Sequence, residues 1–481
     1  MILGDGPAVK PHTFAVHEPA QRGIGALEAV VPIEALDDDG RGVGRAGDLE
    51  VHVAGALPGE TVRARVEHQS PHAPRAWAAL VELAGPPAQE RVAPACPAHG
   101  SCGGCVLQHL AYPAQLTAKR ALVERCLARH ASLAGVTVAD VVAAPHELHY
   151  RNKAKYVVAA RPEGGLVLGS YAPGSHSVVD MAGCQVPEEP IDDVARRLRH
   201  LLEALGATAF DERSRAGELR YIVIRRNAEG EVLVVLVAAT AGQRALLGRA
   251  ARTLRAEAPA IAGVVLHVNA SRSAAIFASD GPPDLVLDGA GALTEQVGDV
   301  RLHLSARAFF QINRLAASRL YVEAARLAGA RPGLRVVDLY SGVGGIALLL
   351  AAQGASVVGV ESLPAAVADA RRSAEASGLS GRARFQEGDA AVGLRAAIRT
   401  LGGLDVLIVN PPRKGLAPAA RTAILQAASR RVIYVSCGPR SLADDLTVLV
   451  DAGYRIDAVR PFDLLPGTPH VETLVSLAKK E

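Results

Sequence analysis

Residues 335–345 read Arg-Val-Val-Asp-Leu-Tyr-Ser-Gly-Val-Gly-Gly, a short apolar run that passes directly into a glycine-rich loop. A helical pattern begins at Ile346, so the stretch has the form strand, glycine loop, helix. Similar apolar runs follow at intervals that leave room for helices, at 356–361, 383–389, 404–410, 432–435, 454–459 and 472–477. Strands that alternate with helices in this way predict a doubly wound α/β sheet.

The loops that follow these strands carry polar residues where a nucleotide-like ligand would lie. The glycine loop lets such a ligand approach the backbone, Glu361 can accept hydrogen bonds from two ribose hydroxyls, and Asp389 can meet an adenine amine. Both NAD and S-adenosylmethionine (SAM) fit this outline. The loop 341–345 lacks the three-glycine spacing of dinucleotide sites, and the strand ending Asn410-Pro-Pro-Arg413 is typical of base-modifying methyltransferases. These two features favour SAM.

The fifth strand of the series ends in a cysteine. Residues 431–439 read Arg-Val-Ile-Tyr-Val-Ser-Cys-Gly-Pro, and the Gly-Pro pair stops the strand directly after Cys437. Because ligands of open α/β sheets bind beyond the carboxyl ends of the strands, this thiol is a candidate nucleophile. The alternative is a buried cysteine that acts as a small hydrophobic residue.

A proline-broken loop, residues 461–472, brings His470 and Glu472 to the start of the last strand. A thiol and a carboxylate at one edge of a sheet suit the methylation of uracil at carbon 5, which is a poor nucleophile by itself. Addition of a thiolate to carbon 6 turns carbon 5 into an enolate carbon that can accept a methyl group, and a base must then remove the carbon 5 proton. We therefore give Cys437 the first role and Glu472 the second. The alternative for Glu472 is a surface carboxylate at a strand end.

Length and composition limit the number of domains and the kinds of protein that the chain can be. Its 481 residues are too many for one hydrophobic core and predict two to four domains. The net charge of +3 is compatible with nucleic acid without arguing for it. Residues 1–25 are rich in Pro and Gly, are expected to form a flexible tail, and show no signal-peptide pattern. No apolar run of the sequence is long enough to span a membrane, so we expect a cytoplasmic protein, and nothing in the sequence implies a protein partner.

Residues 27–83 alternate short apolar runs with turns. The runs lie at 29–33, 49–53, 61–66 and 77–83, and the turns at 39–44 and 57–60. This pattern predicts a small closed β-barrel. The basic residues Arg63, Arg65, His68 and Arg75 could give the barrel a basic face, although charge alone favours an ordinary solvated surface.

Three of the six cysteines, Cys96, Cys102 and Cys105, lie within ten residues, a spacing that favours a metal or cluster site over a disulfide framework. Such a site needs a fourth ligand. Cys126 falls on the apolar stripe of a helix predicted over residues 116–130 and is better explained by core packing, whereas Cys184 lies in a loop and suits a ligand. Four thiolates fit either a structural zinc ion or an iron–sulfur cluster.

Residues 140–300 combine strand and helix patterns and predict a central α+β region. Its clearest hairpin joins 220–226 to 232–237. A basic stretch at 149–156 could contact phosphates or could be a solvated edge strand. The basic side chains concerned are Arg151, Lys153 and Lys155.

The boundary with the doubly wound region is marked by a pair of aromatic residues. Phe309 and Phe310, two of only seven phenylalanines, predict a packed corner that presents Gln311 outward. Asn313 is a suitable N-cap for a helix predicted over 314–328.

Together these motifs resemble the bacterial RNA uridine carbon-5 methyltransferases, specifically the ribosomal-RNA type with an N-terminal TRAM domain and a 4Fe-4S cluster. The resemblance extends from about residue 27 to the end of the chain, and the turns at 39–42 and 57–60 are similar to those of the TRAM domain. Residues 435–439 resemble the family's nucleophile motif, which contains Cys437, and residues 470–472 resemble the motif of the base, which contains Glu472. The SAM-contacting residues that the resemblance implies are Gln311, Tyr340, Gly345, Glu361, Asp389 and Asn410. The implied cluster ligands are Cys96, Cys102, Cys105 and Cys184, which favours iron–sulfur over zinc.

The resemblance implies SAM-dependent methylation of carbon 5 of a uridine in 23S rRNA, with RNA as the partner. The target base must leave its stack to reach the thiol, which is easier for a uridine in a loop or junction. The domains expected are a tail (1–25), a TRAM-like barrel (26–86), an iron–sulfur and central α+β RNA-binding region (87–310) and a SAM-dependent methyltransferase domain (311–481).

Two residues depart from the family pattern, and neither change removes a chemical role. Asn410 stands where the family usually has Asp, so an acceptor oxygen is kept and a charge is lost. Gly438 stands where the family usually has Asn.

Four competing functions differ in substrate or class. A tRNA T-loop uridine would need the same chemistry, although members that act on tRNA commonly lack the TRAM domain and the cluster. RNA cytosine carbon-5 enzymes usually carry a second cysteine where Arg413 stands, and radical-SAM enzymes have a Cys-x3-Cys-x2-Cys spacing that this chain lacks. A non-catalytic RNA-binding module with a decayed site is opposed by the intact Cys437 and Glu472.

Overall fold

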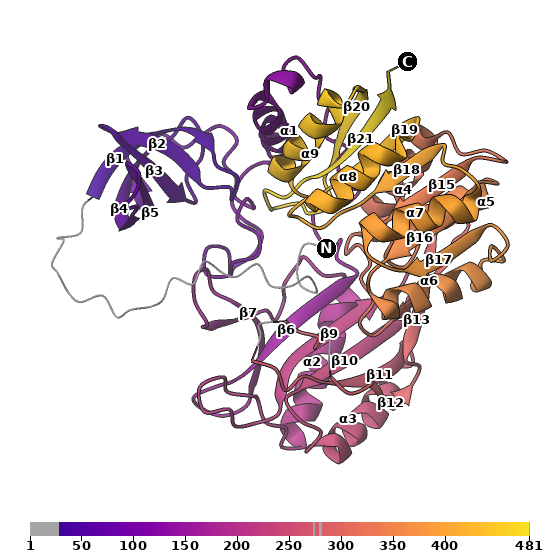
Figure 1. Cartoon of the computed structure of the whole chain (residues 1–481). Coiled ribbons are helices and arrows are strands. Elements are labelled where there is room, and N and C mark those ends of the chain that lie inside the picture. The colour runs from indigo at the N-terminus through magenta and orange to yellow at the C-terminus, as the bar shows by residue number, and fades with distance from the viewer. Residues whose placement is uncertain (1–27, 273–274, 279–280, 481) are drawn as a thin grey trace.

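The structure is a computed structural model that describes residues 28–272, 275–278 and 281–480. The tail expected at residues 1–25 lies outside the described residues. Three parts follow one another along the chain: a small barrel, a central seven-stranded sheet with helices on one face, and a second seven-stranded sheet with helices on both faces (Figure 1). No helix within the described ranges is long and apolar enough to cross a membrane.

The first part is a closed five-stranded barrel, as the sequence predicts, with the strand order β1-β2-β3-β5-β4. Its strands are β1 (Glu28–Leu36), β2 (Gly42–Ala46), β3 (Leu49–Ala54), β4 (Thr61–Gln69) and β5 (Arg75–Leu83). The prediction that residues 39–44 form only a turn is wrong, because β2 begins at Gly42. A Cβ on Gly42 would lie 2.7 Å from the carbonyl oxygen of Ala56, and one on Gly44 would lie 2.0 Å from that of Pro32. The glycines that suggested a turn instead let the backbones of neighbouring segments approach closely.

The cysteine loop leads into α1 (Tyr112–Ala128) and the short 3-10 helix η1 (Ala131–Leu133). The helix begins four residues before the predicted start at residue 116, because Pro113 fits its first turn. Its apolar face, which includes Leu122 and Cys126, shares a core cluster with residues of the C-terminal sheet and its helices. Cys126 is only 1% exposed, which confirms the prediction that it packs in a core.

The central part is a seven-stranded sheet with the order β12-β11-β10-β9-β6-β7-β8. Its strands are β6 (Lys153–Ala160), β7 (Leu166–Tyr171), β8 (Val178–Asp180), β9 (Leu219–Arg226), β10 (Val232–Ala238), β11 (Ile261–Val268) and β12 (Leu285–Gly289). The helices α2 (Glu189–Ala204) and α3 (Arg244–Glu257) pack on one face of this sheet. A hairpin, β13 (Ala292–Val297) and β14 (Val300–Ser305), connects it to the third part.

The third part is the doubly wound sheet that the sequence predicts, with the order β17-β16-β15-β18-β19-β21-β20. The strands are β15 (Arg335–Leu339), β16 (Ser356–Glu361), β17 (Ala383–Glu387), β18 (Val406–Val409), β19 (Arg431–Ser436), β20 (Tyr454–Phe462) and β21 (Glu472–Lys479). The helices are α4 (Arg314–Ala328), α5 (Gly345–Ala352), α6 (Pro364–Ala376), α7 (Ala390–Leu401), α8 (Pro418–Ala427) and α9 (Pro439–Asp451). The strands from β17 to β19 are parallel, whereas β21 runs antiparallel to both of its neighbours.

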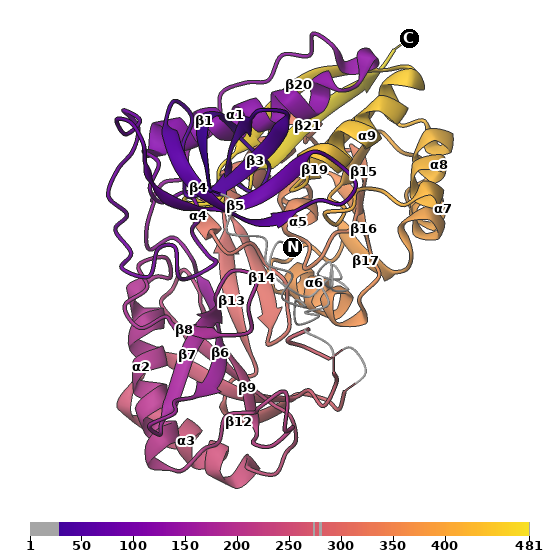
Figure 2. The same cartoon turned by 90° about the vertical axis from the view of Figure 1, so that its left-hand side faces the viewer.

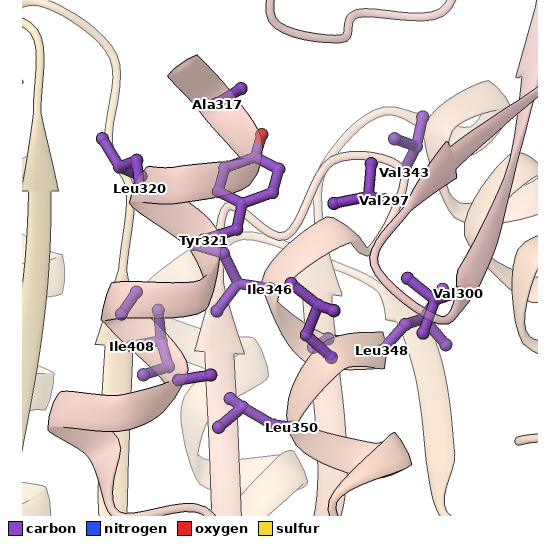
Figure 3. Close-up of a cluster of buried hydrophobic side chains, with 14 of the residues drawn as sticks. Val297, Val300, Ala317, Leu320, Tyr321, Val343, Ile346, Leu348, Leu350 and Ile408 are labelled. Atoms are coloured by element: carbon purple, nitrogen blue, oxygen red, sulfur yellow. The ribbon is translucent and has the colours of Figure 1, made fainter. Parts of the chain in front are cut away.

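Alternation along the strands divides the core of this part into two clusters. Val336 and Ile408 lie on the face covered by α4, α5 and α6. Val337 and Leu407, one position along, lie on the face covered by α7, α8, α9 and α1. Figure 3 shows part of the first cluster, in which Tyr321 of α4 lies beside the start of α5.

The barrel lies beside the end of the third part that carries α1 and α9 (Figure 2). In the turn between β1 and β2, Asp38 forms an ion pair with Arg440 at the start of α9. The backbone oxygen of Leu36 accepts a hydrogen bond from Arg125 of α1 (3.1 Å). The barrel therefore contacts the helix that directly follows Cys437.

Candidate active site

The two predicted catalytic residues lie at the ends of two paired strands. Cys437 follows β19, Glu472 is the first residue of β21, and the strands are antiparallel with Ser436 opposite Thr473. The thiol and the carboxylate therefore flank the last pair of the ladder, at one edge of the sheet. Both are buried, with 6% of Cys437 and 2% of Glu472 exposed. The structure brings together residues that are 35 positions apart in the sequence.

Burial sets the protonation of this pair. Burial raises the pKa of the Glu472 carboxyl to about 7, against a partial opposing effect of the Arg413 guanidinium. Burial, with Glu472 as a second cause, raises the pKa of the Cys437 thiol to about 12, again opposed by Arg413. Within the part of the chain that the structure describes, Glu472 Oε1 is buried and has no hydrogen-bond partner. A carboxylate that is buried and unpaired in this way is available to accept a proton from a substrate.

Arg413 brings a positive charge to the same place. It lies in the loop after β18, is exposed to solvent, and its Nη2 lies 2.5 Å from Nδ1 of His470. Burial and the nearby Arg413 lower the pKa of His470 to about 3, so its ring is neutral and its nitrogen can accept a hydrogen bond from the guanidinium. Arg413 thus stands at the open side of the pair, where a polyanion could reach it.

A buried carboxylate fixes the loop that carries Arg413. Asp445 of α9 accepts hydrogen bonds from the backbone N–H of Leu416 (2.9 Å) and from the hydroxyl of Tyr434 on β19. It also forms an ion pair with Arg421 of α8. Asp445, which is only 1% exposed, therefore connects this loop, the strand β19 and the helices α8 and α9.

The acidic residues predicted to contact a cofactor lie at the same edge of the sheet and organise its loops. The carboxylate of Glu361 accepts hydrogen bonds from the N–H groups of Gly342 (3.1 Å) and Leu363 (2.9 Å), so it links the glycine loop to the start of α6. Asp389 caps α7 by accepting from Ala391 N–H (2.8 Å). Tyr340 has a φ of 62°, and burial, with the carboxylates of Asp389 and Glu361 nearby, raises the pKa of its hydroxyl to about 12. A positive φ at a residue with a large side chain is a strained conformation of the kind found at ligand sites.

The glycines of the loop 341–345 have two different roles. A Cβ on Gly344 would lie 2.6 Å from the ring of Phe385, and one on Gly345 would lie 2.8 Å from the ring of Tyr321. These two glycines are needed for packing. Gly342, with φ of 54°, has open space where a Cβ would point, so a ligand can approach the backbone there.

The corner around Gln311 differs from the sequence prediction. Gln311 is only 6% exposed, so the expectation that it points outward is wrong. Its backbone oxygen accepts from the side chain of Asn152 (3.2 Å), which also donates its backbone N–H to Ile312 (2.9 Å). The corner is thus held between the central sheet and α4, whose predicted N-cap is confirmed by a hydrogen bond from Ala316 N–H to Asn313 (3.2 Å). Asn410, at the end of β18, donates its backbone N–H to the oxygen of Leu339 on β15 (3.3 Å).

Two residues of the site were missed by the sequence interpretation. Asp338 is buried in β15, and burial, with Glu361 as a minor cause, raises the pKa of its carboxyl to about 8. A carboxylate inside an otherwise apolar strand was the available signal. Tyr321, buried on α4, lies close enough to Glu472 and Asp338 for both carboxylates to raise the pKa of its hydroxyl, with burial as the main cause. A tyrosine on the apolar stripe of a helix gave no such signal.

The four cysteines expected to hold a cluster are free and partly buried. Burial raises the pKa of the Cys105 thiol to about 11, and Cys184, Cys102 and Cys96 each raise it further. The four thiols are therefore close enough to interact electrostatically. As the side chains stand, no group of three or more Cys, His, Asp or Glu residues in the described ranges is arranged to hold a metal ion.

Comparisons with known proteins add to this geometry. A protein-family model described as tRNA (Uracil-5-)-methyltransferase matches residues 294–480. An uncharacterized RNA methyltransferase of Halalkalibacterium halodurans is 36% identical over 94% of this chain and 96% of its own length. Another, of Geobacter sulfurreducens, is 35% identical over 98% of this chain and 93% of its own. The crystal structure of Pyrococcus abyssi tRNA (uracil-54, C5)-methyltransferase in complex with S-adenosyl-L-homocysteine has a TM-score of 0.72 and 26% identity, and the match covers 94% of this chain and all of that one.

Proposed function

Because the chain belongs to the RNA (uracil-5-)-methyltransferase family, we propose that it transfers a methyl group from SAM to carbon 5 of one or more uridines in 23S rRNA. The observation that carries this proposal is the pairing of Cys437 and Glu472 across the end of β19 and β21. A buried thiol and a buried, unpaired carboxylate are the two groups that carbon-5 methylation of uracil requires.

The proposed reaction uses these two groups in sequence. The Cys437 thiol first releases its proton to solvent, and the thiolate sulfur then forms a bond to carbon 6. The electrons of the carbon 5–carbon 6 double bond move toward the carbonyl oxygen at carbon 4, giving an enolate. Bound SAM supplies an electrophilic methyl group. Carbon 5 takes this methyl group, and the thioether S-adenosylhomocysteine leaves. Glu472 then removes the carbon 5 proton, the double bond re-forms, and the sulfur of Cys437 leaves carbon 6 as a thiolate.

The free protein keeps its thiol protonated, because the pKa of Cys437 is about 12. Activation therefore requires an event in the complex with RNA. The Arg413 guanidinium, which lowers the pKa values of both Cys437 and Glu472, is the group of this chain suited to stabilise the thiolate and the enolate that follows.

For SAM, we propose Gln311, Tyr340, Gly345, Glu361, Asp389 and Asn410 as the contact residues. The open side of Gly342 and the acidic side chains at the end of β16 and the start of α7 support a ligand with ribose and adenine groups. The amide of Asn410 keeps an acceptor for the positively charged end of SAM but adds no negative charge.

We propose that Cys96, Cys102, Cys105 and Cys184 hold an iron–sulfur cluster. Support comes from the electrostatic interaction of the four thiols and from the Arg151 side chain, which lowers the pKa values of both Cys105 and Cys184 and so favours their thiolates. The roles we infer for the cluster are structural, in fixing the loop 96–105, and in positioning RNA.

A tRNA T-loop uridine is the second candidate substrate. The solved structure whose match covers 94% of this chain is that of a tRNA methyltransferase. Ribosomal RNA remains our first choice because of the resemblance to the ribosomal-RNA type.

Tritium release tests both the chemistry and the substrate. We would incubate anaerobically prepared protein with SAM and with ribosomal or transfer RNA that carries tritium at carbon 5 of uridine, using Cys437→Ala as the control. Release from ribosomal RNA alone, absent in the control, supports the proposal. Release from tRNA alone would replace the substrate while keeping the mechanism, and no release from either RNA, naked or in partly assembled ribosomal particles, would overturn it.

A further inference from the structure

The segment that delivers Glu472 is not a mobile surface loop. We call residues 463–471 the base loop; they join β20 to β21, and seven of the nine residues are buried, with only Pro469 and His470 partly exposed. A buried loop must satisfy its backbone groups with partners elsewhere in the protein. In this protein many of those partners lie in the segment that directly follows the cysteine loop.

The strongest connection is a fully buried ion pair. Lys119 of α1 donates from Nζ to Oδ1 of Asp463 (2.6 Å) and to the backbone oxygen of Leu465 (3.0 Å). Both side chains of the pair are 0% exposed. The same Asp463 oxygen accepts the backbone N–H of Leu465 (2.9 Å), so the lysine fixes the first turn of the base loop.

A buried glutamine on the same helix holds the middle of the base loop. Gln115 Oε1 accepts from Gly467 N–H (2.8 Å), while its Nε2 donates to the oxygens of Leu107 (3.2 Å) and Leu110 (2.8 Å). Leu107 in turn donates its N–H to the oxygen of Gly467 (2.8 Å). The hydroxyl of Tyr150 donates to Pro466 (3.1 Å). The base loop is thus clamped at both its beginning and its centre by residues that precede it by more than 300 positions.

Stability alone does not explain a charged pair in this position. Taking a lysine and an aspartate out of water costs several kcal/mol per ion, and an apolar pair of similar volume is often at least as stable. The pair does, however, define a direction and a distance that apolar packing would not, because Lys119 donates to two acceptors of one turn. The end of the base loop is Glu472, so whatever fixes the loop also fixes the base.

We propose that Lys119 and Gln115 are positioning residues for Glu472, acting through the base loop to hold its carboxylate where it can remove the carbon 5 proton. The inference rests on the proposed function. The helix α1 and the segment that links it to the cysteine loop thereby take part in catalysis without touching the substrate.

The reaction order gives this idea a specific signature. Proton removal is the last chemical step, and before it the RNA is covalently attached to Cys437. A misplaced Glu472 slows only this step, so bond formation and methyl transfer continue while the methylated RNA stays attached to the protein. A general loss of structure would instead reduce every step, including attachment.

The experiment compares three variants with the wild type. The double variant Lys119→Met with Asp463→Asn removes both charges and leaves no unpaired ion, and Gln115→Leu removes the second connection without affecting any charge. Arg120→Gln is the matched control, since Arg120 is on the same helix but its ion pairs, with Glu124 (2.8 Å) and Asp140 (2.5 Å), are exposed. For each protein we measure thermal unfolding, SAM affinity, RNA affinity and tritium release. The RNA–protein adduct is followed on denaturing gels with SAM labelled in its methyl group.

For the double variant and Gln115→Leu we expect tritium release to fall by roughly tenfold or more, since positioned bases contribute factors of this size. SAM and RNA affinity should stay within about twofold of wild type, so that the loss falls on kcat rather than KM. Labelled adduct should accumulate in both variants and in neither the wild type nor Arg120→Gln. A fourth variant, Lys119→Arg with Asp463 unchanged, keeps both charges and should release more tritium than the double variant.

Three results would overturn the inference: wild-type tritium release in both variants, a parallel fall of adduct and release, or accumulation of adduct in Arg120→Gln as well. If the double variant does not fold, Gln115→Leu decides, because it leaves the buried Lys119–Asp463 ion pair intact. A failure of the proposed function looks different, since the wild type itself would then release no tritium.

Discussion

At the scale of single residues, the site pairs a buried thiol with a buried carboxylate that opposes the ionisation of the thiol. The carboxylate of Glu472 raises the pKa of the Cys437 thiol, and burial raises both pKa values. The exposed guanidinium of Arg413 acts in the opposite direction on both groups. In the free protein, therefore, Cys437 is a poor nucleophile, and its reactivity depends on these two neighbours.

Alkylation of Cys437 measures this dependence directly. Replacing Glu472 by Gln removes a negative charge, so the thiol pKa falls and the rate of modification by iodoacetamide at pH 8 should rise. Replacing Arg413 by Gln removes a positive charge and should lower the rate. Modification is followed by mass spectrometry of the peptide that contains Cys437, with the buried Cys126 as an internal control. A slower rate in Glu472→Gln would contradict the electrostatic account.

The stability of Glu472→Gln gives a second test. The pKa of Glu472 is raised from an ordinary value of 4.5 to about 7 in the folded protein, so the unfolded state ionises first. Glu472 therefore does not change the free energy of unfolding below pH 4.5, and it lowers that free energy as the pH rises from 4.5 through 7. The Gln variant lacks this loss and should be more stable than wild type at pH 8 by up to about 3 kcal/mol, from the size of the shift. Urea unfolding at pH 4 and pH 8 checks the sign, and an equal difference at both values would contradict it.

At the scale of the elements, the active edge depends on a side chain that joins four of them. Asp445 holds the loop after β18, the strand β19 and the helix α8 to α9. This explains why Arg413 keeps a fixed place beside Cys437 although its own side chain is exposed.

Substitutions at this point should separate into a large and a small effect. Asp445→Ala leaves a buried hydroxyl, a buried N–H and the partly buried Arg421 unpaired, and we expect a loss of about 3–5 kcal/mol of unfolding free energy. Tyr434→Phe removes one donor and leaves the ion pair, with an expected loss of about 1 kcal/mol. Both values come from urea unfolding, and Thr422→Val on α8, which removes an exposed hydroxyl, is the control. Equal losses in the two variants would show that the network does not centre on Asp445.

Most of the elements could be predicted from the sequence, because the strands of a doubly wound sheet are apolar runs separated by helical patterns. The exceptions have local causes. Glycines at 42 and 44 suggest a turn when only the sequence is considered, yet they serve a close approach of strands. Gln311 follows two aromatic residues and was expected to point outward, yet the central sheet covers it. In both cases the deciding partner lies elsewhere in the chain.

At the scale of the whole molecule, ion pairs connect the central part to the third part, the doubly wound sheet with its helices. Arg314, at the start of α4, pairs with Glu188 just before α2 and with Glu295 on β13 (3.6 Å). Glu295 is 1% exposed, and burial raises the pKa of its carboxyl, while Arg314 opposes that shift. The interface between the two parts therefore contains a buried carboxyl group whose ionised form is favoured by Arg314 and, to a smaller extent, by Arg225.

Arg314→Met should loosen this interface. The variant leaves the buried Glu295 without its ion-pair partner, whereas Glu188 keeps its pair with Arg226 (2.7 Å). We expect a loss of about 3–5 kcal/mol of unfolding free energy, concentrated between the two parts. Calorimetry of the variant should then show two thermal transitions, whereas the wild type should show one. The C-terminal sheet of the variant should still bind SAM. Arg326→Gln, which removes an exposed pair with Glu323 on the same helix, is the control. A single transition shifted to lower temperature would argue that the two parts unfold as one unit.

Contacts between side chains that lie far apart in the chain could not be predicted from the sequence. The candidate catalytic pair could be named, because each residue stands at a strand end and the chemistry requires both. The ion pair between Lys119 and Asp463, which are 344 residues apart, could not be predicted, because a lysine in a helix usually lies on a solvated face. The position of α1 against α9 creates that contact, and no local pattern encodes it.

The register of β19 and β21 has a consequence for how such proteins diversify. The proposed nucleophile and the proposed base are set opposite each other by a ladder of backbone hydrogen bonds, which tolerates almost any side chain. If the barrel and the central sheet recognise the RNA, as the sequence predicts, lineages can exchange these parts while inheriting the same proposed reaction. A chimera that joins this C-terminal sheet, its α1 helix and its base loop to the barrel and central sheet of a relative should methylate the relative's target. An insertion of one residue in either strand should abolish the activity of any such hybrid.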